Sequence, residues 1–152
     1  MNINDLLGRV LMTIGTIIAG CLPLFVDLSP SHVLNPTWPA HARLHEVWLL
    51  ASGALFSLVT LYLIWVHRGE RRQALGAAAV VMGCLLSGFF IAAGTASQYG
   101  GVLVDPLTAP SMPNQDMAFG IPANLLAFGL AFVLLLVGAA LARAAQPSAT
   151  RR

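Results

Sequence analysis

Four long apolar runs divide the chain, and short segments richer in polar and turn-forming residues separate them. The runs cover residues 8–26, 46–66, 74–95 and 119–142. A helix needs roughly 20 residues to cross a hydrocarbon core of about 30 Å, so each run is long enough for one crossing. The pattern predicts an all-α fold, an integral membrane four-helix bundle. It forms a single domain over residues 1–152, with loops at 27–45 and 96–118.

Composition supports this class of protein. Hydrophobic residues make up 57% of the chain and charged residues only 9%, whereas soluble domains carry about 25% charged residues. The sequence contains no phosphate-binding loop, nucleophile constellation or cofactor box, so no organic cofactor is predicted. The net charge of +2 gives no reason to expect a nucleic-acid partner, because the arginines are explained by membrane topology.

The arginines are unevenly divided between the two sides that the four runs define. Only Arg43 falls on one side, and the other side carries Arg9, Arg68, Arg71, Arg72, Arg143, Arg151 and Arg152. Basic residues in short loops stay on the cytoplasmic side of a membrane. The sequence therefore predicts cytoplasmic termini, outward-facing loops at 27–45 and 96–118, and a multi-pass protein of the bacterial inner membrane.

Residues 18–21, IAGC, are similar to the cleavage box of bacterial lipoproteins. The apolar run continues beyond this box through LPLFV, which favours an uncleaved first span. Cys21 and Cys84 fall nearer opposite halves of the bilayer, so both are expected to be unpaired thiols.

The third run carries small residues at spacings of three, four and seven: Gly76, Ala79, Gly83, Ser87 and Gly94. Such a face lets two helices approach closely in lipid. We expect it to pack within the bundle, and a homo-oligomer through Gly76, Gly83, Ser87 and Gly94 is the alternative.

Residues 35–48, NPTWPAHARLHEVW, gather much of the chemistry of the chain. Pro39 suits the first turn of a helix, so Ala40 onward is predicted to be helical. His41 and His45 then share one helix face. Asp27 ends the first span, and the intervening loop returns His32 and Asn35 toward the same end.

We call this end the predicted rim. Its members from the first two spans are Asp27, His32, Asn35, Trp38, His41, Arg43, His45 and Glu46. Asp116 and Asn124 are expected at the same level on the other side of the bundle. Asn124 is placed about two turns into the fourth helix, pointing inward, because a polar side chain facing lipid is costly.

Three functions are compatible with the predicted rim. In the first, it is the mouth of a pocket for an apolar or lipidic small molecule, where Asp27, His41 and His45 transfer protons and the other members bind the molecule. In the second, His41 and His45 ligate a metal ion, with His32 or Asp27 as a third ligand. In the third, the rim is structural, and the protein is a membrane scaffold or partner subunit.

Residues 25–45, FVDLSPSHVLNPTWPAHARLH, resemble the hallmark of an uncharacterised family of small four-span membrane proteins of bacteria and fungi. The family positions in this motif are Asp27, His32, Asn35, Trp38, His41, Arg43 and His45. Leu44 stands where an aromatic residue is usual, and Ala40 where proline is usual. The resemblance implies four spans and names no reaction.

The chain is more distantly similar to the sterol-isomerase and sigma-2 receptor superfamily. This similarity rests on the number of spans and on an Asp, a Pro and a Trp around the first outer loop. It implies a cavity within the bundle that binds a sterol or an amine, which favours the first of the three functions.

Overall fold

The computed structural model describes residues 2–104 and 117–146. Its elements are α1 (Ile3–Thr16), the π-helix η1 (Ile17–Cys21), α2 (Leu22–Asp27), α3 (Ala40–Trp65), α4 (Arg71–Thr95), the 3₁₀ turn η2 (Ala96–Gln98), the strands β1 (Met117–Ala118) and β2 (Ile121–Pro122), and α5 (Ala123–Ala144). Four helical stretches are long and apolar enough to cross a membrane: Ile3–Asp27, Ala40–Trp65, Arg71–Gln98 and Ala123–Ala144. The predicted mostly helical fold with four such helices is confirmed, as is the helix start at Ala40.

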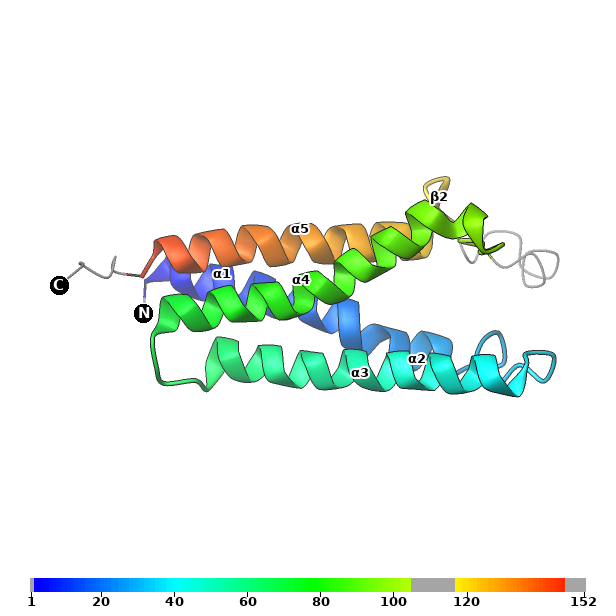
Figure 1. Cartoon of the computed structure of the whole chain (residues 1–152). Helices are drawn as coiled ribbons and strands as arrows, with labels where there is room; N and C mark the ends of the chain where they lie inside the picture. The colour runs from blue at the N-terminus through cyan, green and yellow to red at the C-terminus, as the bar shows by residue number, and fades with distance from the viewer. Residues whose placement is uncertain (1, 105–116, 147–152) are drawn as a thin grey trace.

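The helices lie side by side as an elongated bundle with two different ends (Figure 1). The terminal end carries both ends of the described chain and the turn between α3 and α4, and the loop end carries residues 28–39, 99–104 and 117–122. Toward the loop end, the pair α2–α3 runs apart from the pair α4–α5 (Figure 1). Side chains at the loop end therefore belong to one of two separate arms.

Glycines bring α1 and α5 into close contact. A Cβ atom on Gly8 would lie 2.5 Å from the Gly138 carbonyl oxygen, and one on Gly138 would lie 2.5 Å from the Gly8 oxygen. Two turns after Gly8 on α1, a Cβ on Gly15 would lie 2.7 Å from the Ala131 carbonyl oxygen. Small residues at such crossings let backbones approach where lipid provides no hydrophobic drive. These glycines therefore set a close approach between the backbones of α1 and α5.

The first helical stretch changes neighbours halfway along its length. Its first part, α1, packs on α5, while η1 and α2 pack on α3. The change coincides with η1, the turn before Pro23, whose ring has no N–H and would clash with the carbonyl four residues earlier. At this crossing a Cβ on Gly20 would meet the Ser57 hydroxyl and the Gly53 carbonyl.

The core is formed by apolar side chains from all four stretches, and α4 contributes Leu75, Ala78, Met82 and Leu86 to it. The small-residue face of α4 was predicted to pack within the bundle, and for part of that face this prediction is wrong. A Cβ on Gly83 or Gly94 would have no neighbour within 4 Å among the described residues. Gly76 does lie beside the Arg143 side chain, and Ala79 packs against the core.

The fourth helix begins later than predicted. Residues 117–122 form a two-stranded antiparallel hairpin, in which Ala118 pairs with Ile121. Phe119 and Gly120 at its tip both have positive φ angles, 54° and 76°, a conformation that forms the tight turn of a hairpin. Helix α5 follows from Ala123, so the apolar residues at 119–122 belong to a turn and not to the span.

Candidate functional site

The loop that follows α2 folds as consecutive tight turns. The Asp27 carbonyl accepts a hydrogen bond from Val33 N at 3.0 Å, and the Ser29 carbonyl accepts from His32 N at 3.1 Å. Val33 is 7% exposed. A buried apolar side chain and local backbone hydrogen bonds hold the loop against the helices, which fixes the direction of His32.

The next turn, NPTW, is held by the side chain of Asn35. Its Oδ1 accepts hydrogen bonds from Thr37 N at 3.0 Å and from Thr37 Oγ1 at 2.8 Å, an Asx turn. Trp38 is carried back toward His32, and the two rings meet edge to face with their centroids 5.8 Å apart. Asn35 therefore shapes the loop, and Trp38 contacts a predicted site residue.

Three ionisable side chains near the junction of α2, this loop and α3 lie within electrostatic reach of one another. We call Asp27, His32 and Glu46 the acid cluster. Asp27 Oδ1 lies 3.7 Å from His32 Nε2, an ion pair when the imidazole is protonated. Glu46, on α3, lies near enough to interact electrostatically with both Asp27 and His32. All three side chains are partly buried, which strengthens their mutual interaction relative to water.

Two serines that were not among the predicted site residues extend the acid cluster. Ser31 Oγ lies 2.9 Å from His32 Nδ1, and Ser29 Oγ lies 2.8 Å from Ser31 Oγ. The result is a chain of exchangeable protons from the Asp27 carboxylate through an imidazole to two hydroxyls. The SPSH stretch was the available signal, because serines next to a loop histidine are within reach of its ring.

Arg43 shares a face of α3 with Glu46, one turn before it. Its Nε is buried and has no hydrogen-bond partner within residues 2–104 and 117–146. Arg43 thus adds a positive charge to the face of α3 that carries Glu46.

His41 and His45 form a pair of their own. Their Nε2 atoms are 2.9 Å apart, and both residues are exposed. At about 100° per residue, His45 lies about 40° around the helix from His41, while Glu46 lies about 140° and Leu50 about 180° away. Since Leu50 is buried against the bundle, the histidine pair faces away from the acid cluster. The structure thus divides the predicted rim within α2–α3 into two groups.

The remaining predicted members lie elsewhere. Asn124 is the second residue of α5, so its prediction two turns inside a helix is wrong, because the helix begins at Ala123. Its Nδ2 donates to the Leu103 carbonyl at 3.0 Å, and its Oδ1 accepts from Leu125 N at 2.7 Å. Asn124 therefore ties the loop before α5 to that helix, on the α4–α5 arm. Asp116 lies outside the described residues.

Within residues 2–104 and 117–146, no three His, Cys, Asp or Glu side chains lie together as a metal-binding group. His41 and His45 converge, but neither His32 nor Asp27 joins them as the third ligand that was predicted. Cys21 and Cys84 are both free thiols.

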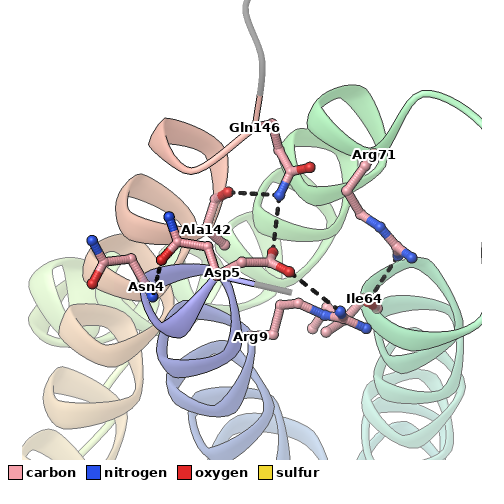
Figure 2. A network of polar contacts seen from close by, with 8 residues as sticks. Asn4, Asp5, Arg9, Ile64, Arg71, Ala142 and Gln146 are labelled. Atoms are coloured by element: carbon pink, nitrogen blue, oxygen red, sulfur yellow. Dashed lines mark hydrogen bonds and ion pairs between the residues drawn. The ribbon is translucent and has the colours of Figure 1, made fainter.

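A second polar cluster, missed by the sequence analysis, lies at the terminal end (Figure 2). Asp5 and Arg9 are 8% and 7% exposed, and their side chains approach to 3.6 Å between Oδ2 and Nη1. Gln146 Nε2 donates to Asp5 Oδ1 at 2.9 Å. The Arg9 guanidinium lies over the Trp65 ring, 4.2 Å from its centroid. We call these residues the terminal clamp.

The terminal clamp connects three helices, since Asp5 and Arg9 come from α1, Trp65 from α3, and Gln146 from the turn after α5. Nearby, Arg71 Nη1 donates to the Ile64 carbonyl at 3.1 Å and satisfies one open carbonyl near the end of α3 (Figure 2). The available signal in the sequence was an acid and a base four residues apart in the first turns of an apolar helix.

Two shallow hollows lie along α4 and α5. Ser87, Ile91 and Phe132 line both of them. Neither hollow includes a residue of the acid cluster or of the histidine pair.

Comparisons with protein-family models, with curated proteins and with solved structures found no match to this chain. The two resemblances described above therefore stay predictions.

Proposed function

We propose that the four long helices cross a membrane, with both termini in the cytoplasm of a bacterial cell and the loop end outside. Large apolar side chains point outward around the middle of the bundle: Leu58, Val80, Ile91 and Val133 are 63%, 65%, 66% and 58% exposed. A monomer in water rarely exposes a continuous apolar surface of this kind. The arginines at the terminal end support the orientation.

We further propose that the acid cluster binds the polar head of an apolar or lipidic small molecule and exchanges a proton with it. The observation that supports this most directly is that Asp27 and His32 form a partly buried ion pair and that Glu46, from a third segment, is also partly buried and interacts electrostatically with both. Charged residues are scarce in this chain, and partly buried carboxylates with a histidine are suited to acid–base work near neutral pH.

The proton has a defined route. The carboxylate of Asp27 accepts it from the head group, and the imidazole of His32 takes it up at Nε2 while releasing one from Nδ1 to Ser31. The hydroxyls of Ser31 and Ser29 then pass a proton on to water. Each transfer moves one proton between neighbouring heavy atoms, so that the head group ends with one proton fewer, water ends with one more, and the protein groups keep the charges they began with.

The apolar part of the molecule has a surface to lie on. Phe25, Leu28 and Val47, next to the acid cluster in sequence, are 82%, 46% and 44% exposed. A molecule that enters sideways from the bilayer would keep its tail on these side chains while its head reaches the carboxylates. Trp38, edge-on to His32, lies beside the same position.

Native mass spectrometry of gently extracted protein tests this proposal. We expect wild type to carry a small-molecule adduct that is lost in Asp27→Asn, His32→Gln and Glu46→Gln. Glu70→Gln is the matched control, because Glu70 is an exposed carboxylate in the turn at the terminal end. An adduct of equal occupancy in all five proteins, or bare protein throughout, contradicts the proposal.

A structural role for the acid cluster is the competing function, and the packing of Val33 and its hydrogen bond to Asp27 favour it. In that case the same variants lower the unfolding temperature and no protein carries an adduct. The protein would then be a membrane scaffold or a partner subunit whose outer loop is held in place by Asp27 and His32.

A further inference from the structure

His41 and His45 present two ring nitrogens to one point in space. Their Nε2 atoms are 2.9 Å apart and the ring planes are inclined by 88°. Both residues are exposed in the first turns of α3. In the metal-free protein this contact is a hydrogen bond between two neutral imidazoles, one donating and one accepting.

The separation of the two nitrogens selects a coordination geometry. A metal–nitrogen bond is about 2.0–2.1 Å long. Two such bonds at a right angle put the nitrogens about 2.9 Å apart, whereas a tetrahedral angle puts them about 3.3 Å apart. The observed 2.9 Å is the length of a hydrogen bond between the rings, and it lets the two nitrogens reach neighbouring positions of a square or tetragonal site by ring rotation with little change in their spacing. That geometry is typical of Cu(II) and Ni(II), and Cu(II) binds nitrogen ligands most strongly among the divalent first-row ions.

We propose that His41 and His45 form a two-histidine site for Cu(II) at the loop end. Binding needs no net loss of a proton, because the donor imidazole only moves its N–H from Nε2 to Nδ1 as both Nε2 lone pairs turn to the metal. No third protein ligand lies with the pair within the described residues. Water or a ligand from outside therefore occupies the other coordination positions, and the ion is exchangeable.

The site is independent of the proposed function. Around α3, Glu46 points about 140° from His41 and about 100° from His45, so a metal ion on the pair does not occupy the acid cluster. Loss of copper binding and loss of the small-molecule adduct are consequently separate outcomes, each with its own variants.

Trp48 provides a reporter next to the pair. It lies one turn beyond His45, with the ring centroids 6.1 Å apart, and its side chain is 67% exposed. Bound Cu(II) is paramagnetic and should quench the fluorescence of this indole more than that of Trp65 at the other end of the bundle.

The test is a titration of full-length, tag-free protein in detergent with Cu(II), followed by electron paramagnetic resonance and tryptophan fluorescence. Wild type should show one tetragonal Cu(II) signal with coupling to two nitrogens. His41→Ala and His45→Ala should each weaken binding by roughly tenfold or more, because a chelate loses its second, effectively intramolecular contact. His67→Ala, which removes a histidine at the terminal end, should leave the signal unchanged.

A register variant controls for folding and for the number of histidines. His45→Val combined with Val47→His keeps the composition and exchanges two exposed positions, but it moves the second imidazole about 160° around the helix from its former direction. We expect the two-nitrogen signal to disappear while the circular dichroism and melting curve stay those of wild type.

Three results would overturn the proposal. The first is an unchanged signal in the register variant. The second is equal occupancy by Zn(II) in competition with Cu(II), since Cu(II) binds nitrogen ligands more strongly than Zn(II). The third is disappearance of the wild-type signal when Cys21 and Cys84, both free thiols, are replaced by alanine.

Discussion

Substitution of Gly138 by alanine tests the close contact between α1 and α5. The new Cβ would lie 2.5 Å from the Gly8 oxygen, 2.8 Å from Met12 N and 2.9 Å from Met12 Cγ. The first two neighbours are backbone atoms, which cannot rotate away as a flexible side chain can. Helices α1 and α5 must therefore separate by about 1 Å to restore ordinary contact distances of about 3.5 Å.

The magnitude follows from the packing that is lost. A gap of about 1 Å forfeits up to about half of the attraction of each atom pair across the crossing, and Met12 and Leu135 beside it are fully buried. Overpacking of this kind costs about 1–3 kcal/mol. Because the obstruction is backbone, we expect the upper half of this range, about 2–3 kcal/mol of unfolding free energy.

Gly83→Ala is the matched control. Gly83 also lies inside a long helix, α4, but its Cβ would meet nothing within 4 Å among the described residues. Both substitutions carry the same gain in helix propensity, at most about 1 kcal/mol. The difference in stability between the two variants therefore isolates the steric cost at Gly138.

Unfolding in detergent, followed by circular dichroism as the fraction of sodium dodecyl sulfate rises, measures this difference. Equal stability of Gly138→Ala and Gly83→Ala would refute the close approach of α1 and α5. If Gly83→Ala is instead the less stable variant and converts a dimer to a monomer in light scattering, the homo-oligomer predicted through Gly76, Gly83, Ser87 and Gly94 is supported.

Three further outcomes are expected. Arg9→Gln should lower the unfolding free energy by about 3 kcal/mol, because it leaves the buried Asp5 carboxylate without its cation; a loss below about 1 kcal/mol in the same detergent titration counts against the terminal clamp. Asn124→Ala removes two hydrogen bonds worth about 1 kcal/mol each. Amide hydrogen exchange should then accelerate in residues 99–104. Unchanged exchange would show that other contacts hold the loop. In intact cells, a membrane-impermeant maleimide should label the Thr37→Cys variant, whereas the Arg68→Cys variant should be labelled only after the membrane is opened. The reverse pattern contradicts the proposed orientation.

The first turns of α3 show how much of the candidate site could be predicted. The preference of proline for the start of a helix correctly placed the first residue of α3 at Ala40, directly after Pro39. The helical repeat correctly put His41 and His45 on one face. The sequence did not reveal that Glu46, one residue further, interacts electrostatically with Asp27 and His32. Deciding this required knowing which side of α3 is covered by α2.

The serines of the acid cluster were missed for a related reason. Their contacts depend on the turns of the loop after α2, where the Asp27 and Ser29 carbonyls accept hydrogen bonds from residues several positions ahead. Asn124 was misplaced because residues 119–122 are apolar enough to extend a span, while positive φ angles at Phe119 and Gly120 turn them into a hairpin.

By itself, the sequence determined the number of long helices, their approximate limits and the concentration of arginines at one end, since these follow from run length and local charge. Only the tertiary structure decided which face of each helix is buried. In a chain of this composition both the covered and the outward faces are apolar, so polarity does not distinguish them. The structure accordingly placed the tight crossing at Gly8 and Gly138 and left Gly83 open, and it separated the histidine pair from the acid cluster.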